Sequence, residues 1–514
     1  MHIVWFKRDL RTVDHAALSM AAASGPVTAL YVVEPEYWSL PDTSARQWKF
    51  VSETLSGLSS ELEELGLFLT IRIGDVVDIL TTLHVDYHLQ SLHSHEETGN
   101  LWTFKRDRRV KKWVEENNVI WTEHRQFGVK RRLNDRNGWA QKWDTLMRAP
   151  MVTVPNKICS GPILESNSIP TVKSLGMKDD PCPGRQVGGR VAGQRTLEKF
   201  LTNRGHAYHR SMSSPNTAFD GCSRLSPYLS VGCLSMREIA QATWQRMSQV
   251  RDQPKAEIGT WGVALRAFSA RLHWHCHFIQ KLEDEPRFEY SNIHPGYDGM
   301  RNEDYVSPAH FQAWTDGRTG FPFVDACMRA LNQTGWINFR MRAMLTAFAS
   351  YHLWLHWRPT GLHLARQFTD YEPGIHWNQM QMQSGTTGIN TVRIYNPVKQ
   401  GYDHDPAGTF IRNWVPELKN VETAFIHEPW KMYPIDQQTA GCILGKDYPK
   451  PIIDHVEAAR AARKLIYGRR SGRDFCDEAS RIQARHGSRK SGLSAKKRRH
   501  RKMILDTAQF TLDL

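Results

Sequence analysis

The chain has 514 residues, of which 40% are hydrophobic and 23% are charged. These values are ordinary for a soluble protein of several globular domains, and they exclude the collagen-like, disordered and disulfide-rich miniprotein classes. The formal net charge is +14, which favours polyanionic partners, with nucleic acid first among them. The longest apolar stretch without an acidic or basic residue, 343–357, is shorter than the roughly 20 residues that a membrane span requires. We therefore expect no membrane partner.

Charged side chains interrupt the first apolar run at Lys7, Arg8, Asp9 and Arg11, which is not the pattern of a secretory signal. We therefore expect a cytoplasmic protein. The eight cysteines include no C-x-x-C pair, so a zinc ribbon or a thioredoxin-like site has no support. Reduced thiols are the expectation.

The first 130 residues alternate between short β-branched runs and helical patterns. Strands are predicted at 2–6, 27–33, 67–73 and 119–123, and a helix at 44–65, where apolar residues recur at spacings of three and four before Gly66. Strands separated by helices imply right-handed crossovers and a parallel sheet. In such sheets ligands sit outside the carboxyl ends of the strands, but no G-x-G-x-x-G motif follows the first strand. We predict an α/β domain over residues 1–130.

Prolines and glycines weaken the pattern further along the chain, and we interpret residues 131–204 as an interdomain linker. Helical spacing then dominates, which predicts an all-α domain over 205–468. The last segment, 469–514, holds 13 basic and 5 acidic residues, including the run K-K-R-R-H-R-K at 496–502. Such a basic tail is often an interaction arm, and a solvated extension without function is the alternative. We expect a monomer.

The segment 221–229 reads G-C-S-R-L-S-P-Y-L and precedes a predicted helix. Hydroxyl groups, an arginine and free backbone N–H groups at a helix start suit a phosphate. A serine followed by proline is also ordinary helix capping, so this segment alone is a weak signal.

The segment is one of an ordered set of motifs along the chain, and the set is more informative than the segment alone. The set comprises V-W-F-K-R-D-L-R at 4–11, the segment above, T-G-F-P-F-V-D at 319–325, G-W-I-N-F-R-M-R at 335–342, R-I-Y-N-P-V-K-Q at 393–400 and F-I-R-N-W-V-P-E-L at 410–418. Together these motifs resemble the photolyase/cryptochrome family of flavoproteins over roughly residues 1–465. That resemblance implies a parallel-sheet α/β domain followed by an all-α domain that binds FAD.

The resemblance also implies an activity. The expected function is that of a blue-light-driven deoxyribodipyrimidine photolyase, a carbon–carbon lyase that repairs pyrimidine dimers, of the cyclobutane type first, by electron transfer from reduced flavin. The expected partner is UV-damaged DNA, single- or double-stranded, with the lesion flipped out of the base stack. Two alternatives stay open. One is a cryptochrome-type photoreceptor without repair, and the other is a (6-4) photolyase in which His273 or His275 takes the place of the absent histidine.

The resemblance assigns cofactor contacts position by position. Tyr208 and the segment Cys222, Ser223, Arg224, Leu225 and Ser226 match the FAD phosphate contacts, with Cys222 where threonine is usual. Arg342 and Asp370 match an Arg–Asp pair beside the isoalloxazine ring. Glu372 takes the place of a second acid, and His275 takes the place of an arginine.

The resemblance also assigns catalytic positions, with several departures. Trp274 matches the tryptophan that stacks on the lesion, but Arg271 replaces a glutamate of the lesion pocket and Phe339 replaces an asparagine. The position near flavin N5 falls on Asn378 by residue type, whereas His376 aligns with it equally well by count. Trp357 keeps the middle place of the electron-transfer chain, whereas the outer place falls on Asp304, next to Tyr305. Trp354, Trp377 and Tyr305 are candidate substitutes in that chain.

Other prosthetic groups have less support. An iron–sulfur cluster is not expected, because Cys327, Cys442 and Cys476 are isolated in the sequence. An antenna chromophore of unknown identity remains open for the α/β domain. We expect no metal site at the alternating residues His273, His275 and His277, because alternate residues of a helix do not share one face.

Overall fold

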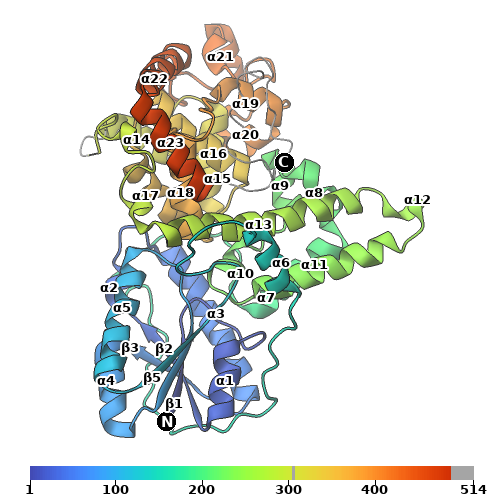
Figure 1. Cartoon of the computed structure of the whole chain (residues 1–514). Helices are drawn as coiled ribbons and strands as arrows, with labels where there is room; N and C mark the ends of the chain where they lie inside the picture. The colour runs from blue at the N-terminus through green and yellow to red at the C-terminus, as the bar shows by residue number, and fades with distance from the viewer. Residues whose placement is uncertain (304–306, 488–514) are drawn as a thin grey trace.

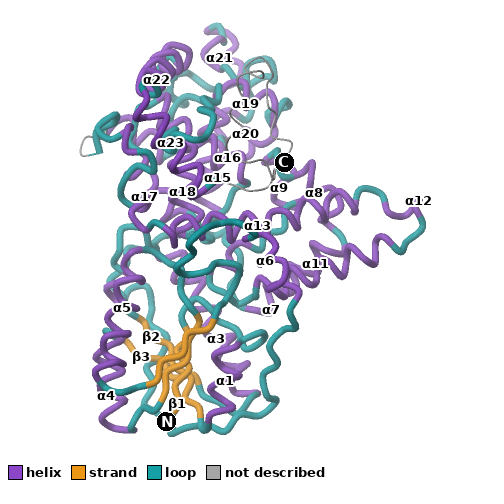
Figure 2. Tube along the Cα trace, viewed as in Figure 1, coloured by secondary structure: helices purple, strands orange, loops and turns teal. Residues whose placement is uncertain are grey.

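The computed structural model describes residues 1–303 and 307–487. Its N-terminal part contains a five-stranded, fully parallel sheet in the order β3-β2-β1-β4-β5 (Figure 2). The strands are β1 His2–Phe6, β2 Val27–Val33, β3 Leu69–Ile73, β4 Ser91–His95 and β5 Ile120–His124. Phe6 pairs with Tyr31, and Val4 pairs with both Ala29 and His93. The predicted parallel α/β domain is thus confirmed.

The helices of this part cover both faces of the sheet (Figure 1). They are α1 Ala16–Ser24, α2 Pro35–Trp38, α3 Ala45–Glu64, α4 Val76–Tyr87 and α5 Leu101–Glu116. Helices α1 and α3 pack on one face and helices α4 and α5 on the other. The predicted helix at 44–65 corresponds to α3. Strand β4, S-L-H-S-H, was not predicted, because it has only one apolar residue and no β-branched one.

Residues 131–204 contain two helices, α6 Trp139–Arg148 and α7 Arg190–Thr202, with a long irregular segment between them. That segment lies against the α/β part. Val27 donates a backbone hydrogen bond to Cys159 at 2.9 Å, and Ile158 donates one to Leu65 at 2.9 Å. Backbone pairing of this kind satisfies polar groups that an irregular surface segment would otherwise leave to water.

The C-terminal part is helical, as predicted. Its helices up to the expected lesion pocket are η1 Arg204–Ala207, α8 Tyr208–Ser211, α9 Pro215–Gly221, α10 Ser226–Ser230, α11 Met236–Arg251, α12 Lys255–Ile258 and α13 Trp261–Asp284. The following helices are η2 Pro286–Glu289, η3 Pro295–Tyr297, α14 Pro308–Thr315, α15 Pro322–Thr334, α16 Phe339–Ala347, η4 Phe348–His352, α17 Trp357–Gln367 and α18 Pro373–Ser384. The last are α19 Pro397–His404, α20 Thr409–Trp414, η5 Pro416–Leu418, η6 Pro429–Lys431, α21 Pro434–Ala440, α22 His455–Arg469 and α23 Arg473–His486.

One hydrophobic cluster runs from the α/β part into the helical part. It contains Phe6 of β1 and Trp48 of α3 together with Leu225, before α10, and Phe268 of α13. A second cluster lies wholly in the helical part, between α15, α16, α17 and α18. The long helix α13 lies along the boundary between the two parts (Figure 1). The two parts therefore share a core, and residues at their boundary are buried by both.

The segment expected as a basic tail, 469–514, begins with ordered structure. Helix α23 packs on the helical part, where Phe475 stacks on His294 with ring centres 3.8 Å apart. His486 Nε2 lies within hydrogen-bond distance of Oε2 of Glu285, at 2.8 Å. Residues 488–514, which hold the run at 496–502, lie outside the described residues. Among the helices of the described part, none combines the length and the apolar character of a membrane span.

Candidate functional site

An ion pair joins α16 to the turn before α18. Arg342 donates from Nη1 to Oδ1 of Asp370 at 3.0 Å and from Nη2 to Oδ2 at 2.8 Å. Asp370 is buried, whereas about a quarter of the Arg342 side chain is exposed. The guanidinium also lies 4.0 Å from the centre of the Phe368 ring. Two parallel hydrogen bonds fix both side chains, so the pair expected beside the flavin is a rigid feature of the fold.

A cluster of arginines surrounds the thiol of Cys222, between α9 and α10. Its members come from four parts of the chain: Arg204, Arg224, Arg271 and Arg342. Burial raises the pKa of the Cys222 thiol to about 12, although the arginines oppose this shift. Burial lowers the pKa of Arg224 to about 10, and Asp370 opposes that shift. Four cations around one buried position exceed the charge of a single carboxylate, so this cluster suits an anionic ligand such as a diphosphate.

The backbone of the segment after Cys222 is shaped by this cluster. Arg224 has a left-handed conformation, with φ of 58°, and its carbonyl accepts a hydrogen bond from Gln186 Nε2 at 2.9 Å. The carbonyl of Ser223 accepts one from Arg204 Nη2 at 2.6 Å. The Leu225 side chain is 1% exposed and packs in the core, and Ser226 begins α10. Only the backbone of Leu225 is therefore free to face a ligand.

The loop after α8 links the arginine cluster to the expected lesion pocket. Arg271 Nη2 lies 3.6 Å from Sδ of Met212, and Asn338 donates from Nδ2 to the Met212 carbonyl at 3.0 Å. Oδ1 of Asn338 is buried and has no hydrogen-bond partner. Tyr208 is buried, and burial raises the pKa of its hydroxyl, which the neighbouring Arg271 opposes. Phe339 is half-exposed.

Helix α13 carries the tryptophan expected to stack on the lesion. Trp274 is half-buried and stacks on Phe278, with ring centres 5.6 Å apart and an interplanar angle of 28°. Its ring also lies 5.2 Å from that of His277. Residues four apart share one face of a helix, so Trp274 and Phe278 form a flat aromatic surface there.

The alternating histidines of α13 reach three different neighbours. His273 pairs with Asp144 at 2.9 Å and lies 3.8 Å from the Trp143 ring of α6. Arg136 Nη1 lies 3.2 Å from Nδ1 of His277. His275 faces the Phe127 ring, with centres 6.0 Å apart. Burial, with Arg8 nearby, lowers the pKa of His275 to about 4, so this residue does not supply the positive charge of the arginine expected in its place.

Glu372, the second acid of the expected flavin site, pairs with a residue from the other end of the chain. Arg8 donates from Nη2 to Oε2 of Glu372 at 2.5 Å, while Oε1 is buried without a hydrogen-bond partner. Arg8 also donates from Nε to the Ser230 carbonyl at 2.8 Å. Sequence reasoning missed this contact, because 364 positions separate the two residues and no periodic pattern links them.

Helix α18 and the start of α17 bring two fully buried tryptophans together. The rings of Trp357 and Trp377 have centres 5.9 Å apart, at an interplanar angle of 70°. Trp357 donates from Nε1 to Oδ1 of Asn292 at 2.9 Å. Asn378 donates from Nδ2 to the Gly374 carbonyl at 2.7 Å, whereas its Oδ1 is buried without a partner.

Trp354 differs from these two tryptophans. It has a φ of 52°, and the guanidinium of Arg301 lies 4.5 Å from its ring centre. A cation at that distance destabilises a cation radical on the indole. The guanidinium nearest to the Trp377 ring, that of Arg358, lies farther away, at 5.7 Å from the ring centre, so this effect is weaker there. Asp304 and Tyr305 lie outside the described residues.

A cavity of about 90 Å³ lies where β1, β2 and β4 end at the carboxyl edge of the sheet. Its lining includes aromatic rings of Trp5, Tyr31 and Trp38. Glu34 also lines it, and the Oε1 atom of Glu34 is buried without a partner. Burial raises the pKa of Glu34 to about 7, although Arg106 opposes the shift. Sequence reasoning placed a ligand site at this edge in general terms but assigned none of these residues to it.

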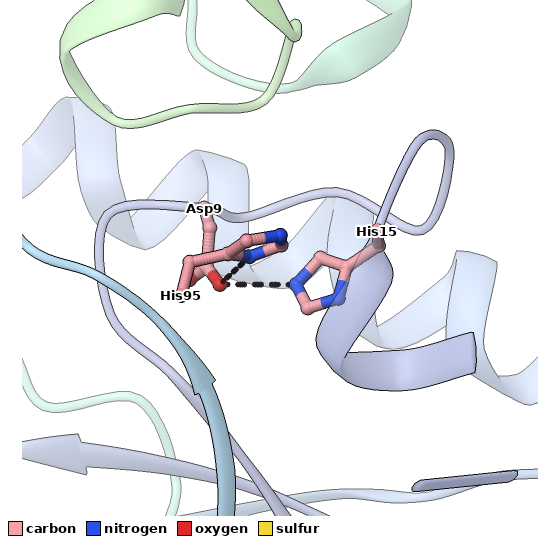
Figure 3. Close-up of side chains that lie close together, drawn as sticks. All are labelled: Asp9, His15 and His95. Atoms are coloured by element: carbon pink, nitrogen blue, oxygen red, sulfur yellow. Dashed lines mark hydrogen bonds and ion pairs between the residues drawn. The ribbon is translucent and has the colours of Figure 1, made fainter. Parts of the chain in front are cut away.

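Asp9, His15 and His95 form a buried cluster (Figure 3). His15 Nε2 is 3.0 Å and His95 Nδ1 is 2.7 Å from Oδ2 of Asp9. His15 Nδ1 accepts the backbone N–H of Leu18, so the ring hydrogen of His15 is on Nε2 and points at Asp9. This nitrogen has no lone pair for a metal ion. Although burial opposes it, hydrogen bonds from both histidines hold the pKa of Asp9 well below its usual range.

Asp9 in turn anchors the loop after β1, because its Oδ1 accepts the backbone N–H of Lys7 at 2.7 Å. The same loop docks on the end of α10, where Leu10 donates to the Val231 carbonyl at 3.1 Å. Gly232 has a φ of 70°, and a Cβ atom there would collide with the Arg8 carbonyl oxygen. The close approach of the two parts at this point therefore requires glycine.

Comparisons with known proteins agree with this geometry. A family model described as DNA photolyase matches residues 2–127, and one described as the FAD binding domain of DNA photolyase matches residues 268–467. A deoxyribodipyrimidine photo-lyase of Escherichia coli is 30% identical over 479 residues, which cover 89% of this chain and 96% of its own length. A cryptochrome DASH of Gloeobacter violaceus is 26% identical over 492 residues, which cover 90% of this chain and 95% of its own.

Among solved structures, a bacterial class III photolyase from Agrobacterium tumefaciens matches with a TM-score of 0.78 at 26% identity. The match covers 91% of this chain and 97% of that one. The family models cover the parallel sheet and the stretch of the helical part that contains Arg271 and the Arg342–Asp370 pair, whereas Arg204, Cys222 and Arg224 lie between the two matched ranges. The chain belongs to the photolyase/cryptochrome family.

Proposed function

We propose that this protein is a blue-light-driven DNA photolyase that repairs cyclobutane pyrimidine dimers with an electron from reduced FAD. The observation that carries the proposal is the arginine cluster around Cys222 with the Arg342–Asp370 pair at its side. Four arginines beside the one carboxylate of Asp370 leave an excess of positive charge that an anion would balance, and the family model of the FAD-binding domain, which covers Arg271 and Arg342, supports FAD as that anion.

The residues present fit FAD. Arg204 and Arg224 supply positive charge for the diphosphate, with the backbone around Ser223 and Ser226 at the start of α10. Asn338, with its buried and unpartnered Oδ1, leaves an acceptor for an N–H or O–H group of the ligand. When bound and reduced, the cofactor supplies the light-driven electron that splits the dimer. The protein's own residues hold it, exclude water and present the lesion.

Trp274 and Phe278 form the aromatic surface on which a flipped base would stack. Arg271, near Met212 at the edge of the pocket, reverses the charge of the glutamate that the family carries there. Its guanidinium suits a phosphate or the carbonyl edge of a base. The partner is UV-damaged DNA, and the protein's net charge of +14 favours its phosphates.

Trp357 and Trp377 are the proposed route by which the flavin is reduced before repair, because their rings are close and both are fully buried. The cavity at the sheet edge is the proposed antenna site. Its aromatic rings suit a planar chromophore, and Glu34 Oε1 would accept a hydrogen bond from a ring N–H of that molecule.

The test is blue-light repair of an oligonucleotide with one defined cyclobutane thymine dimer, with the flavin reduced chemically and a dark control. Chemical reduction bypasses the tryptophan route, so the assay reports on the lesion pocket alone. Light-dependent loss of the dimer is expected. An intact dimer with flavin bound and reduced would refute the proposal.

A cryptochrome-type photoreceptor without repair is the second candidate. The observations that favour it are Arg271 and the half-exposed Phe339 at the two altered pocket positions. A parallel assay with a (6-4) lesion separates the remaining alternative from this one. His273 and His275, the histidines considered for an acid role there, contact Asp144 and Phe127. Repair of neither lesion would leave the photoreceptor.

The basic segment 488–514 is expected to bind phosphates of the DNA. It holds eight basic and two acidic residues. Its removal should make the dependence of log K on log salt concentration shallower, by roughly 0.9 for each phosphate that the segment neutralises on duplex DNA. The measurement is a salt titration of binding to an undamaged duplex.

Deletion of 503–514 alone is the matched control, because it removes both acidic residues of the segment and none of its lysines or arginines. An unchanged slope after removal of 488–514 would mean that this segment does not touch phosphate. Both deletions leave α23 in place, which matters because Ile482 of α23 belongs to the core of the helical part.

A further inference from the structure

Four consecutive residues, 369–372, reach two different sites with alternate side chains. Thr369 and Tyr371 line the cavity at the sheet edge. Asp370 receives both hydrogen bonds of Arg342 in the expected flavin site. Glu372 accepts a hydrogen bond from Arg8, and Arg8 also lines the cavity. One short segment thus forms a wall of the cavity and carries both acids of the flavin site.

Arg8 is held in place from the α/β part. The Asp9–His15–His95 cluster anchors the loop that carries it (Figure 3). Arg8 Nε donates a hydrogen bond to the carbonyl of Ser230, the last residue of the helix that begins with Ser226. Arg8 therefore touches both chain segments that frame the expected flavin site, the one after Cys222 and the one around Asp370.

We propose that Arg8 is a positioning residue of the FAD site, and that it couples this site to the sheet-edge cavity through Glu372 and the segment 369–372. The inference rests on the proposed position of FAD beside Arg342 and Asp370. Arg8 belongs to the α/β domain and lines the sheet-edge cavity, yet by this proposal it sets how tightly the helical domain binds FAD.

The physical basis is a buried acid with one charged partner. Of the Glu372 side chain, 8% is exposed, and Arg8 is its only ion-pair partner among the described residues. The other charged or titratable groups that act on the pair are Glu97 and Tyr37 from the α/β part and His275 and Cys276 of α13. None of these is a cation in place to replace Arg8. Without Arg8, Glu372 would be a buried, unpaired carboxylate that either takes up a proton or moves the segment toward water.

The experiment compares Arg8→Met with Arg190→Met as the matched control. Arg190 forms a buried pair with Glu238 at 2.6 Å and also donates to a backbone carbonyl, that of Cys233, but it does not touch the segment 369–372. FAD is titrated into the apoprotein of each variant, followed by flavin fluorescence. The dissociation constant is expected to rise at least tenfold in Arg8→Met and to stay within twofold of the parent in Arg190→Met.

The pH dependence separates positioning from general destabilisation. Burial already raises the pKa of Glu372, and Arg8 opposes this shift. An acid whose pKa is raised by the fold stabilises the folded state only while it is protonated, so FAD affinity in Arg8→Met should fall as the pH rises from about 5 to about 9. The double variant Arg8→Met/Glu372→Gln carries no such charge and should recover affinity and lose the pH dependence.

Three results would overturn the inference: unchanged FAD affinity in Arg8→Met, an equal loss in Arg190→Met, or no recovery in the double variant. Failure of the flavin site itself is recognised separately. Asp370→Asn would then leave FAD binding unchanged, whereas loss of FAD in Asp370→Asn together with normal binding in Arg8→Met would refute only the role of Arg8.

Discussion

Replacing Asp370 with asparagine is expected to destabilise the folded protein by roughly 3 kcal/mol and to release FAD during purification. The side chain keeps its shape but loses its charge, so Arg342 keeps a guanidinium without a counter-ion in a place only a quarter exposed. Removing one partner of a buried pair costs about 3–5 kcal/mol, and the partial exposure of Arg342 favours the lower end. The loss is large because the negative charge of Asp370 also stabilises the charged form of Arg224 in the arginine cluster.

Thermal unfolding and the flavin-to-protein absorbance ratio measure the two effects. Glu417→Gln is the matched control, since Arg329 makes the same two-pronged pair with Glu417, at 2.8 and 3.0 Å, outside the arginine cluster. The control should retain its flavin. Normal flavin content in Asp370→Asn, or an equal loss in both variants, would contradict the assignment of Asp370 to the cofactor site.

An element of the fold was predictable where its own residues show a periodic spacing of apolar side chains. Helix α3 was predicted from apolar spacing, because one face of it packs on the sheet. Strand β4 was missed because four of its five residues are serines and histidines, although all five are buried. The Ser91 hydroxyl, for example, lies within hydrogen-bond distance of His93 Nε2 and of His2 Nδ1. Periodicity detects hydrophobic burial and does not detect hydrogen-bonded burial.

The residues of the candidate site were likewise predictable only where the sequence carries a local motif. Arg342 and Asp370 were named by resemblance, and the structure adds that they form a rigid, two-pronged pair. The contact between Arg8 and Glu372 could not be read from the chain, because it exists only where the two domains meet. Site chemistry at a domain boundary depends on packing between distant segments, for which a single sequence offers no local signal.

Trp274→Ala is expected to lower the affinity for DNA that contains a dimer by about 5- to 150-fold. The range follows from the roughly 1–3 kcal/mol that stacking of one base on an aromatic side chain contributes. Affinity for undamaged duplex should change little, because phosphate contacts dominate that binding and do not involve the indole. The dissociation constants for both oligonucleotides are measured at one fixed salt concentration.

The appropriate control is Trp261→Ala, on the first turn of the same helix. Trp261 is also half-buried and packs against Arg246, with the guanidinium 5.2 Å from its ring centre, so its removal also costs packing on α13. If both variants lost affinity for the dimer equally, the effect would come from the helix and not from stacking. If Trp274→Ala weakened binding to damaged and undamaged DNA alike, Trp274 would contact the backbone, and the lesion pocket would have to be sought elsewhere. A selective loss in Trp274→Ala would place the flipped base against α13, where Phe278 extends the aromatic surface by one turn.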